Sequence, residues 1–230
     1  MPRRPRLVAP NIPLHIIQRG NNRNNCFFEN SDYLVYLDLL RHSSVAESCR
    51  IHAYVLMSNH IHILVSPSHE RAPGNMMKAV GERYVQYVNR RYNRTGTLWQ
   101  GRFRSCPVQD DAYLIVCQRY IEMNPVRAGM VSHPSLYQWS SHRRNAYGSP
   151  DALVTPHPIV DALGIDDFSR AHAYRNLFSE DLPEKKIAEL REATNSNYVF
   201  GTDGFAVNLA LALGRQVARV STKRRLLYDE

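Results

Sequence analysis

The apolar residues of the chain follow two spacings, one typical of strands and one typical of helices. Short runs with an apolar residue at every second position, or with continuous apolar residues, predict strands over residues 12–19, 51–57, 60–65 and 98–108. Longer runs with an apolar residue at every third or fourth position predict helices over residues 31–48, 76–91 and 110–123. Ser31 is expected to cap the first helix, the stretch from Pro67 to Gly74 to be a loop, and Pro125 to stop the third helix.

The order strand, helix, strand, strand, helix, strand, then helix is that of the split βαβ, ferredoxin-like arrangement. This is an α+β fold in which an antiparallel sheet carries helices on one face, and its other face is open to hold a site. We expect residues 1–148 to form this domain. Residues 149–158 are rich in Pro and Ser, which predicts a linker. Residues 159–230 show helical spacing and end in a basic tail, Lys223-Arg-Arg, which predicts a small helical C-terminal extension.

The charge of the chain indicates what kind of partner this fold has. The 230 residues carry a net charge of +8, and only 4 of the 29 cationic side chains are lysine. The planar group of arginine makes bidentate contacts to phosphate and guanine. Residues 71–150 hold 12 Lys and Arg against 4 Asp and Glu, whereas residues 151–230 hold 10 against 12. The 13 tyrosines argue against a disordered basic protein. A nucleic-acid groove in the middle third is one interpretation, and a solvated basic surface is the other.

Other classes of protein are excluded by what the sequence lacks. No apolar run approaches the length of a transmembrane helix, and the basic start is not followed by the apolar stretch of a signal peptide. The four cysteines are scattered and form no Cys-x-x-Cys motif, so we expect reduced thiols and no cysteine-based zinc site. These features favour a cytoplasmic protein.

His60 and His62 lie two positions apart on a predicted strand. Successive side chains of a strand point to opposite faces, so both histidines share one face with Leu64, while Ile61 and Ile63 point into the core. Two imidazoles on one face are a metal-ligand geometry. The alternative interpretation is a pair of partly exposed histidines on a sheet.

Tyr120 and Asn124 lie four positions apart at the end of a predicted helix, and therefore on one face. Taken alone, the tyrosine is explained by packing and the Asn-Pro pair by a helix stop. A phenolate can also attack a phosphodiester and form a covalent phosphotyrosine, provided that the phosphate is neutralised. An amide oxygen and two imidazoles would leave coordination positions free for phosphate. Mg²⁺ prefers oxygen ligands, and Mn²⁺ accepts imidazole more readily.

Five stretches of the chain together resemble the REP-associated tyrosine transposases, domesticated single-tyrosine relatives of the smallest insertion-sequence transposases. The resemblance covers residues 8–148, with a weaker similarity around Arg191-Glu-Ala-Thr-Asn. The stretches are His15-Ile-Ile-Gln-Arg-Gly-Asn-Asn-Arg, Met57-Ser-Asn-His-Ile-His-Ile-Leu-Val, Tyr87-Val-Asn-Arg-Arg-Tyr, Gly96-Thr-Leu-Trp-Gln-Gly-Arg-Phe and Tyr120-Ile-Glu-Met-Asn-Pro-Val-Arg-Ala-Gly.

The resemblance implies a role for each candidate residue. His60 and His62 would be the paired ligands of the family's His-hydrophobe-His (HUH) motif, and Tyr120 the nucleophile that takes the 5′ phosphate and releases a 3′ hydroxyl. Asn124 would be the third ligand of a Mg²⁺ or Mn²⁺ ion, at a position where wider relatives carry Gln. The substrate would be single-stranded DNA folded as a short palindromic hairpin.

Basic and aromatic residues outside this group are candidates for binding DNA. Arginines interleaved with aromatic residues can hold phosphates and stack on bases. Tyr84, Tyr87 and Tyr92 compete with Tyr120 for the nucleophile role, but Tyr84 and Tyr87 lie on an apolar stripe and are assigned to packing. The lone strand histidines His15 and His52 are assigned to structural roles. The DNA-binding candidates are Arg19, Asn21, Asn22, Arg23, Arg90, Arg91, Arg94, Trp99, Arg102, Phe103, Arg104 and Arg127.

The leading hypothesis is a metal-dependent single-stranded DNA endonuclease and strand transferase that acts at hairpin repeats. One alternative is a hairpin-binding protein without cleavage activity, and another is a small-molecule metallohydrolase that uses water as nucleophile. We expect DNA hairpins as partners in the nucleoid, no membrane partner and no organic cofactor. A monomer is favoured over the dimer of the insertion-sequence relatives.

Overall fold

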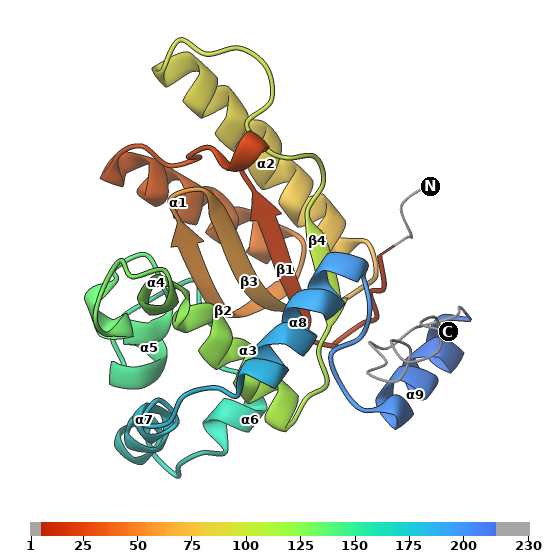
Figure 1. Ribbon diagram of the computed structural model, residues 1–230. Coiled ribbons are helices and arrows are strands. Elements are labelled where there is room, and N and C mark those ends of the chain that lie inside the picture. Colours follow the sequence, from red (N-terminus) through yellow and green to blue (C-terminus); the bar gives the residue numbers. More distant parts are fainter. Residues whose placement is uncertain (1–5, 215–230) are drawn as a thin grey trace, which may run out of the picture.

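A computed structural model describes residues 6–214, in which four antiparallel strands form one sheet with helices on both faces (Figure 1). Strands β1 (Leu14–Arg19), β2 (Cys49–Met57), β3 (His60–Pro67) and β4 (Arg104–Pro107) lie in the order β2-β3-β1-β4. Helix α1 (Asn30–Ala46) follows β1 and α2 (Ala72–Arg91) follows β3. This is the split βαβ order, so the α+β class expected from the sequence is confirmed.

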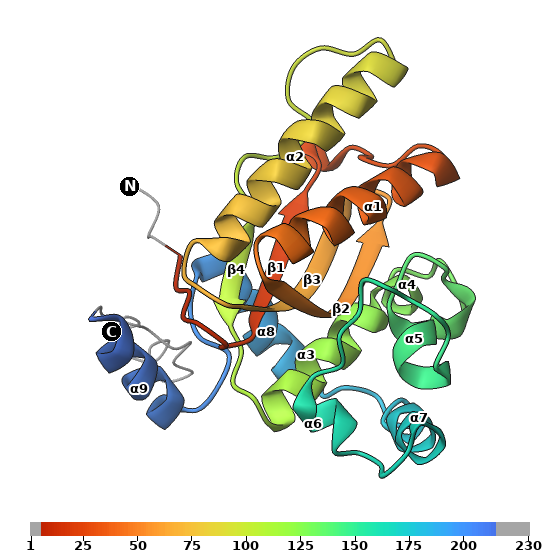
Figure 2. The same cartoon turned by 180° about the vertical axis from the view of Figure 1, so that it is seen from behind.

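One face of the sheet packs against α1 and α2, which lie side by side across it in Figure 2. Ile61 and Ile63 of β3 point into this layer, where they meet Val80 and Tyr84 of α2. The alternation of side chains along β3 therefore separates its isoleucines from its histidines, as predicted.

Helix α1 starts earlier than the sequence suggested. Glu29, not Ser31, is the N-cap residue, and Asp32 accepts hydrogen bonds from the backbone N–H groups of Phe28 and Glu29. Asp32 is fully buried and also accepts from the hydroxyl of Tyr87. A buried carboxylate at this position satisfies the free N–H groups of the helix start, so Ser31 is left inside the helix.

Two further boundaries differ from the prediction. Helix α2 begins at Ala72, because Pro73 falls in the first turn, where its missing N–H is not needed, and the predicted loop therefore ends before Gly74. The strand predicted over residues 98–108 is reduced to β4. Gly101 has a φ of 69°, and the turn there separates β4 from the isolated bridge between Trp99 and Gly20.

The second face of the sheet, expected to be open, is covered in part by α3 (Ala112–Glu122) and α8 (Glu184–Ser196), which lie in front of the strands in Figure 1. Val55 and Leu64 of the sheet form one apolar cluster with Leu114 and Ile121 of α3 and Leu190 of α8. The apolar side chains of this face require cover, and the C-terminal third of the chain supplies much of it.

The residues predicted as a linker are packed along the sheet edge. Leu153 and Val154 are buried, and the backbone N–H of Thr155 donates to the carbonyl of Ile51 at 2.7 Å. The C-terminal region is helical as expected, although its tail at Lys223 lies outside the described residues. The remaining helices are α4 (Asn124–Arg127), α5 (His142–Tyr147), α6 (Pro158–Asp161), α7 (Asp167–Asn176) and α9 (Asp203–Leu213).

All four cysteines are free thiols, as predicted, and all four are buried. Among residues 6–214, no helix has the length and apolar character needed to cross a membrane.

Candidate active site

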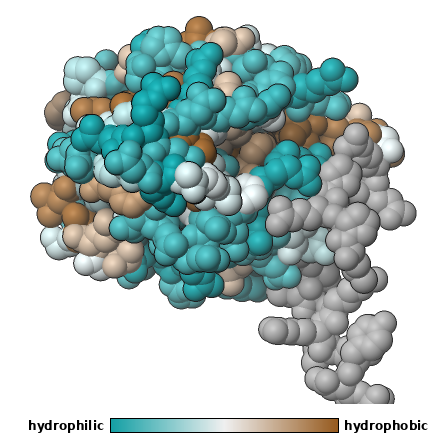
Figure 3. Space-filling view, turned by 90° about the horizontal axis from the view of Figure 1, so that it is seen from above, coloured by the Kyte–Doolittle hydropathy of each residue, from teal (hydrophilic) through white to brown (hydrophobic). Residues whose placement is uncertain are grey.

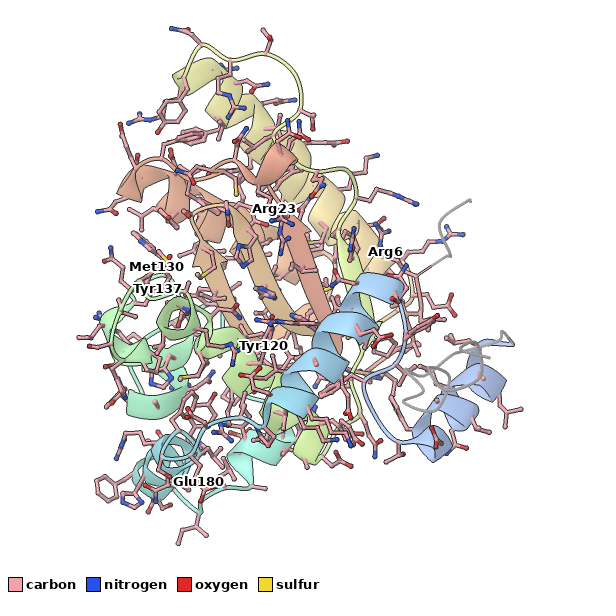
Figure 4. All side chains as sticks on the ribbon, viewed as in Figure 1. Arg6, Arg23, Tyr120, Met130, Tyr137 and Glu180 are labelled. Carbon is pink, nitrogen blue, oxygen red and sulfur yellow. The ribbon has the colours of Figure 1, made fainter. Side chains whose placement is uncertain are left out.

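A cavity of about 360 Å³ lies between the sheet and the helices of its second face. Four residues that the sequence singled out line it together: His60, His62, Tyr120 and Asn124. Figure 4 shows Tyr120 between the strands and α8. The cavity therefore joins the histidine strand β3 to the tyrosine helix α3, which sequence spacing alone did not establish.

His60 and His62 share one face of β3, with ring centroids 5.1 Å apart. Burial, and then the positive charge of Arg19, lowers the pKa of His60 to about 4. Burial, and then neighbouring His15, lowers the pKa of His62 well below its usual value. Both rings are therefore neutral at pH 7, which is the form of imidazole that binds metal ions.

His60 is oriented by its neighbour Asn59. The amide Nδ2 of Asn59 donates to the carbonyl of Arg23 at 3.1 Å, so its Oδ1 is the atom that lies 2.6 Å from His60 Nδ1. A carbonyl oxygen only accepts, so His60 carries its proton on Nδ1 and leaves the lone pair of Nε2 free.

Tyr120 stands edge-on to two histidines. Its ring centroid lies 5.6 Å from that of His62 and 6.1 Å from that of His15. Its hydroxyl accepts a hydrogen bond from Nε of Arg191 at 3.3 Å. The side chain is only 5% exposed, so the phenol is held against the imidazoles by its surroundings.

Asn124 begins helix α4 instead of ending α3, because Pro125 occupies the first turn of a new helix. Its Nδ2 donates to the carbonyls of Tyr120 at 2.8 Å and Ile121 at 3.3 Å. These bonds turn the amide so that Oδ1 is available. Pro125 was expected to stop a helix, and α3 does end before it at Glu122, although the chain turns at Met123 directly into α4.

The donor set fits a hard or borderline divalent ion. In His60 and His62 the Nδ1 atom is bonded within the protein, and in Asn124 the Nδ2 atom is, which leaves two Nε2 atoms and one Oδ1 atom. Within residues 6–214, no three His, Cys, Asp or Glu side chains are grouped to hold a metal. An ion at this site would therefore depend on the amide oxygen, water or phosphate for its further ligands.

Three further residues of the cavity were missed by sequence reasoning. His15 was assigned a structural role, but its Nε2 lies 2.8 Å from Nδ1 of His62. Arg191 and Thr194 come from α8, and Thr194 Oγ1 lies 2.9 Å from Nδ1 of His15. Two signals were present: His15 is on the strand that pairs with the histidine strand, and the weaker family similarity around Arg191-Glu-Ala-Thr-Asn covers both Arg191 and Thr194.

Part of the predicted basic group surrounds the cavity. Arg19 and Arg127 line it, while Arg102 and Arg104 line an adjoining cavity of about 270 Å³. Burial, and then the charges of Arg23 and Arg104, lowers the pKa of Arg19, so positive charge is concentrated here.

The other candidates lie elsewhere. Asn21, Asn22 and Arg23 form a short 3₁₀ turn after β1. Arg90 and Arg91 end α2, which extends beyond the strands in Figure 1, and Arg91 pairs with Glu29. Arg94 lies over the ring of Phe28, and the surface at this end is largely hydrophilic (Figure 3).

The two aromatic residues expected to stack on bases are mostly buried. Trp99 is 5% exposed and packs against Tyr36 and Tyr84 in the core. Phe103 is 8% exposed, and the guanidinium of Arg6 lies 3.6 Å from its ring centroid. Both residues also line a cavity of about 760 Å³ beside α2, so their role in DNA binding stays a prediction.

A solved structure with a TM-score above 0.5 agrees with this fold. The chain is similar to a REP-associated tyrosine transposase solved bound to a REP hairpin, with a TM-score of 0.56, 16% identity, and coverage of 68% of this chain and 93% of the other. It is also similar to a putative transposase from Deinococcus radiodurans R1, with a TM-score of 0.37, 18% identity, and coverage of 53% and 96%. No curated protein matches the chain.

The sequence model described as "Transposase IS200 like" matches residues 9–124, which is half of the chain. The matched region includes the strands, the paired histidines, Tyr120 and Asn124. It ends before α8, although α8 contributes Arg191 and Thr194 to the cavity. This protein belongs to the family of IS200-like transposases.

Proposed function

We propose that this protein cleaves and rejoins single-stranded DNA at palindromic hairpins, with Tyr120 as the nucleophile and with His60, His62 and Asn124 as ligands of Mg²⁺ or Mn²⁺. The observation that supports it most is the convergence of these four side chains in one cavity of one chain. The similar REP-associated transposase was solved with a REP hairpin, which favours DNA of that form as the substrate.

The chemistry follows from the position of the phenol. The Tyr120 oxygen would attack the phosphorus, a bond would form between them, and the bond from phosphorus to the 3′ oxygen would break. The phenol proton is released, and the departing oxygen takes up a proton to become a 3′ hydroxyl. A second 3′ hydroxyl can reverse the reaction and join a new strand. A bound divalent ion would neutralise the phosphate and stabilise the departing oxygen.

Binding of DNA is assigned to the cations closest to the cavity. Arg19 and Arg127 stand at the cavity itself, and Arg102 and Arg104 extend the positive surface toward Arg6. Arginine can contact phosphate with two parallel hydrogen bonds, so these side chains are suited to hold a strand across Tyr120.

The test is formation of a covalent adduct between the full chain and a hairpin single strand in the presence of Mn²⁺. Tyr120→Phe removes the attacking oxygen and keeps the ring, so the adduct should disappear while hairpin binding remains. Tyr113→Phe removes a hydroxyl from the same helix, away from the cavity lining, and should leave the adduct in place.

An adduct that persists at its full level in Tyr120→Phe would contradict the role of Tyr120. Hairpin binding without any adduct in the native chain would point to a binding protein that does not cleave. Turnover of small phosphate esters without an adduct would point to a metallohydrolase.

A further inference from the structure

Three hydrogen-bond contacts connect α8 to His62 through the protein interior. The hydroxyl of Thr194 donates to the carbonyl of Leu190 at 2.8 Å. Thr194 Oγ1 lies 2.9 Å from His15 Nδ1, and His15 Nε2 lies 2.8 Å from His62 Nδ1. Thr194, His15 and His62 are at most 3% exposed, so water does not compete for these contacts.

The direction of the contacts follows from the number of protons. Thr194 has one hydroxyl proton, and Leu190 receives it, so toward His15 the threonine oxygen accepts. Nδ1 of His15 therefore carries a proton. His15 is 1% exposed and its two ring nitrogens face the uncharged Thr194 hydroxyl and His62 ring, so a charged His15 would lack a compensating partner; the ring is neutral and its Nε2 has a lone pair. This Nε2 must accept, and Nδ1 of His62 must donate.

This tautomer of His62 leaves a nitrogen lone pair available to bind a metal ion. With its single proton on Nδ1, His62 keeps the lone pair of Nε2 free. Reversing the contacts would place the proton of His62 on Nε2 and remove the ligand atom. Asn59 imposes the same tautomer on His60 by a separate contact, so both histidines are prepared alike.

We propose that Thr194 and His15 are positioning residues that set the tautomer of His62, and that α8 in this way prepares the site to bind its metal ion. The part concerning the metal rests on the proposed function, whereas the tautomer rests on the hydrogen-bond geometry alone. The assignment gives a role to a helix that lies outside the residues matched by the family model.

The direct test is ¹⁵N–¹H correlation spectroscopy of the histidine rings in the metal-free full chain. His62 and His15 are expected to carry their protons on Nδ1. His52 is the internal standard, because its Nδ1 lies 2.7 Å from the carbonyl of Thr155 and must donate there. A proton on Nε2 of His62 would overturn the proposal.

The second test compares variants at Thr194. Thr194→Val keeps the shape of the side chain and removes the oxygen that accepts from His15. We expect the His62 tautomer to change in the ring spectra. We also expect the Mn²⁺ affinity, measured by electron paramagnetic resonance, to fall by about 10-fold or more. Thr194→Ser retains a hydroxyl and should restore both. Cys106→Ala removes another contact to Thr194, at 3.2 Å, and should leave the tautomer unchanged.

The outcomes separate this proposal from the proposed function. If the native chain binds Mn²⁺ and Thr194→Val binds it equally well with an unchanged His62 tautomer, the positioning role is wrong and the proposed function stands. If the native chain binds no Mn²⁺, the proposed metal site is wrong, and the ring spectra still decide the tautomer. If Thr194→Val does not fold, the spectra of the native chain decide alone.

Discussion

Single side chains decide which atoms remain available for chemistry at this site. Asn59 and His15 occupy the Nδ1 atoms of the two paired histidines, and the amide nitrogen of Asn124 bonds to the carbonyl of Tyr120. Each contact also fixes a ring or amide plane, which limits the entropy that binding of an ion would otherwise cost. Burial of these side chains also keeps the histidine rings neutral in the folded state, because it lowers their pKa.

This neutrality makes stability dependent on pH, and His52 allows the effect to be measured away from the cavity. Burial lowers the pKa of His52 to about 4, while the unfolded chain titrates near 6.5. Between these values only the unfolded state binds the proton, so the free energy of unfolding falls as the pH falls from 6.5 toward 4. In His52→Gln, this slope should be smaller by about 1.4 kcal/mol per pH unit.

Urea unfolding between pH 7.5 and 4.5 measures the slope. His69→Gln removes an exposed histidine and is the control for loss of a histidine as such. Equal slopes in the native chain and in His52→Gln would contradict the expectation.

Helix α3 owes its position to a buried carboxylate two residues after Tyr120. Glu122 is fully buried and accepts hydrogen bonds from Ser141 at 2.6 Å and Asn145 at 2.8 Å on or beside α5, and from Tyr174 of α7 at 2.9 Å. His142 Nδ1 lies 3.0 Å from the same carboxylate. These contacts hold the tyrosine helix against the sheet within its own chain.

The Glu122 carboxylate is contacted by four side chains, those of Ser141, His142, Asn145 and Tyr174. Glu122→Gln replaces one of its acceptor oxygens by an NH₂ donor, so at least one of these buried groups loses its acceptor. We expect a loss of about 2–4 kcal/mol in the free energy of unfolding. Glu82→Gln changes an exposed carboxylate on α2 and should alter stability by about 0.5 kcal/mol or less. A similar small effect for both variants in denaturant titrations would contradict the importance of this carboxylate for α3.

Helix α8 contacts Tyr120, the proposed nucleophile, through Arg191. Arg191→Gln removes the guanidinium that donates to the Tyr120 hydroxyl and lies 5.8 Å from its ring centroid. The rate of adduct formation should fall about 10- to 100-fold, corresponding to loss of a hydrogen bond from a charged group. Hairpin affinity should change less than the rate.

Lys185→Gln removes one positive charge from an exposed position of the same helix. It should leave the rate of adduct formation near that of the native chain. An equal decrease for both variants in single-turnover assays would mean that the net charge of α8 matters, and not the contact to Tyr120.

For the molecule as a whole, the position of the positive charge matters more than its total. The arginines that line the cavity and its neighbour come from β1, from β4 and the segments before β1 and β4, from α4 and from α8, whereas Arg41 lies on α1 across the sheet. A strand that crosses Tyr120 would meet the first group and not the second.

Salt titration of binding to a single strand distinguishes the two groups. Arg102→Gln should reduce the slope of log affinity against log salt concentration by about 0.7, the value for one lost contact to single-stranded phosphate. Arg41→Gln removes the same charge and should leave the slope unchanged. Equal slopes for the two variants would place the DNA path elsewhere.

Local spacing was enough to predict much of the fold and part of the site. The alternation in β3 placed His60 and His62 on one face and Ile61 in the core, and helical spacing placed Tyr120 on α3, because both patterns depend on neighbours along the chain. The predicted start of α1 at Ser31 failed, because that boundary depends on which buried group satisfies the free N–H groups of the helix start. That group is the buried Asp32, which also accepts a hydrogen bond from Tyr87 of α2, so a residue distant in the sequence helps to decide the boundary.

By itself, the sequence determined the order of the elements, the faces of its strands and the residue types available for chemistry. Only the tertiary structure decided that α3 and α8 cover the second face, that Trp99 is buried, and that His15 and Thr194 reach His62. The His15–Thr194 contact joins residues 179 positions apart. No local pattern encodes such a contact, because it arises from the requirement to cover an apolar sheet face and to pair the polar groups buried with it.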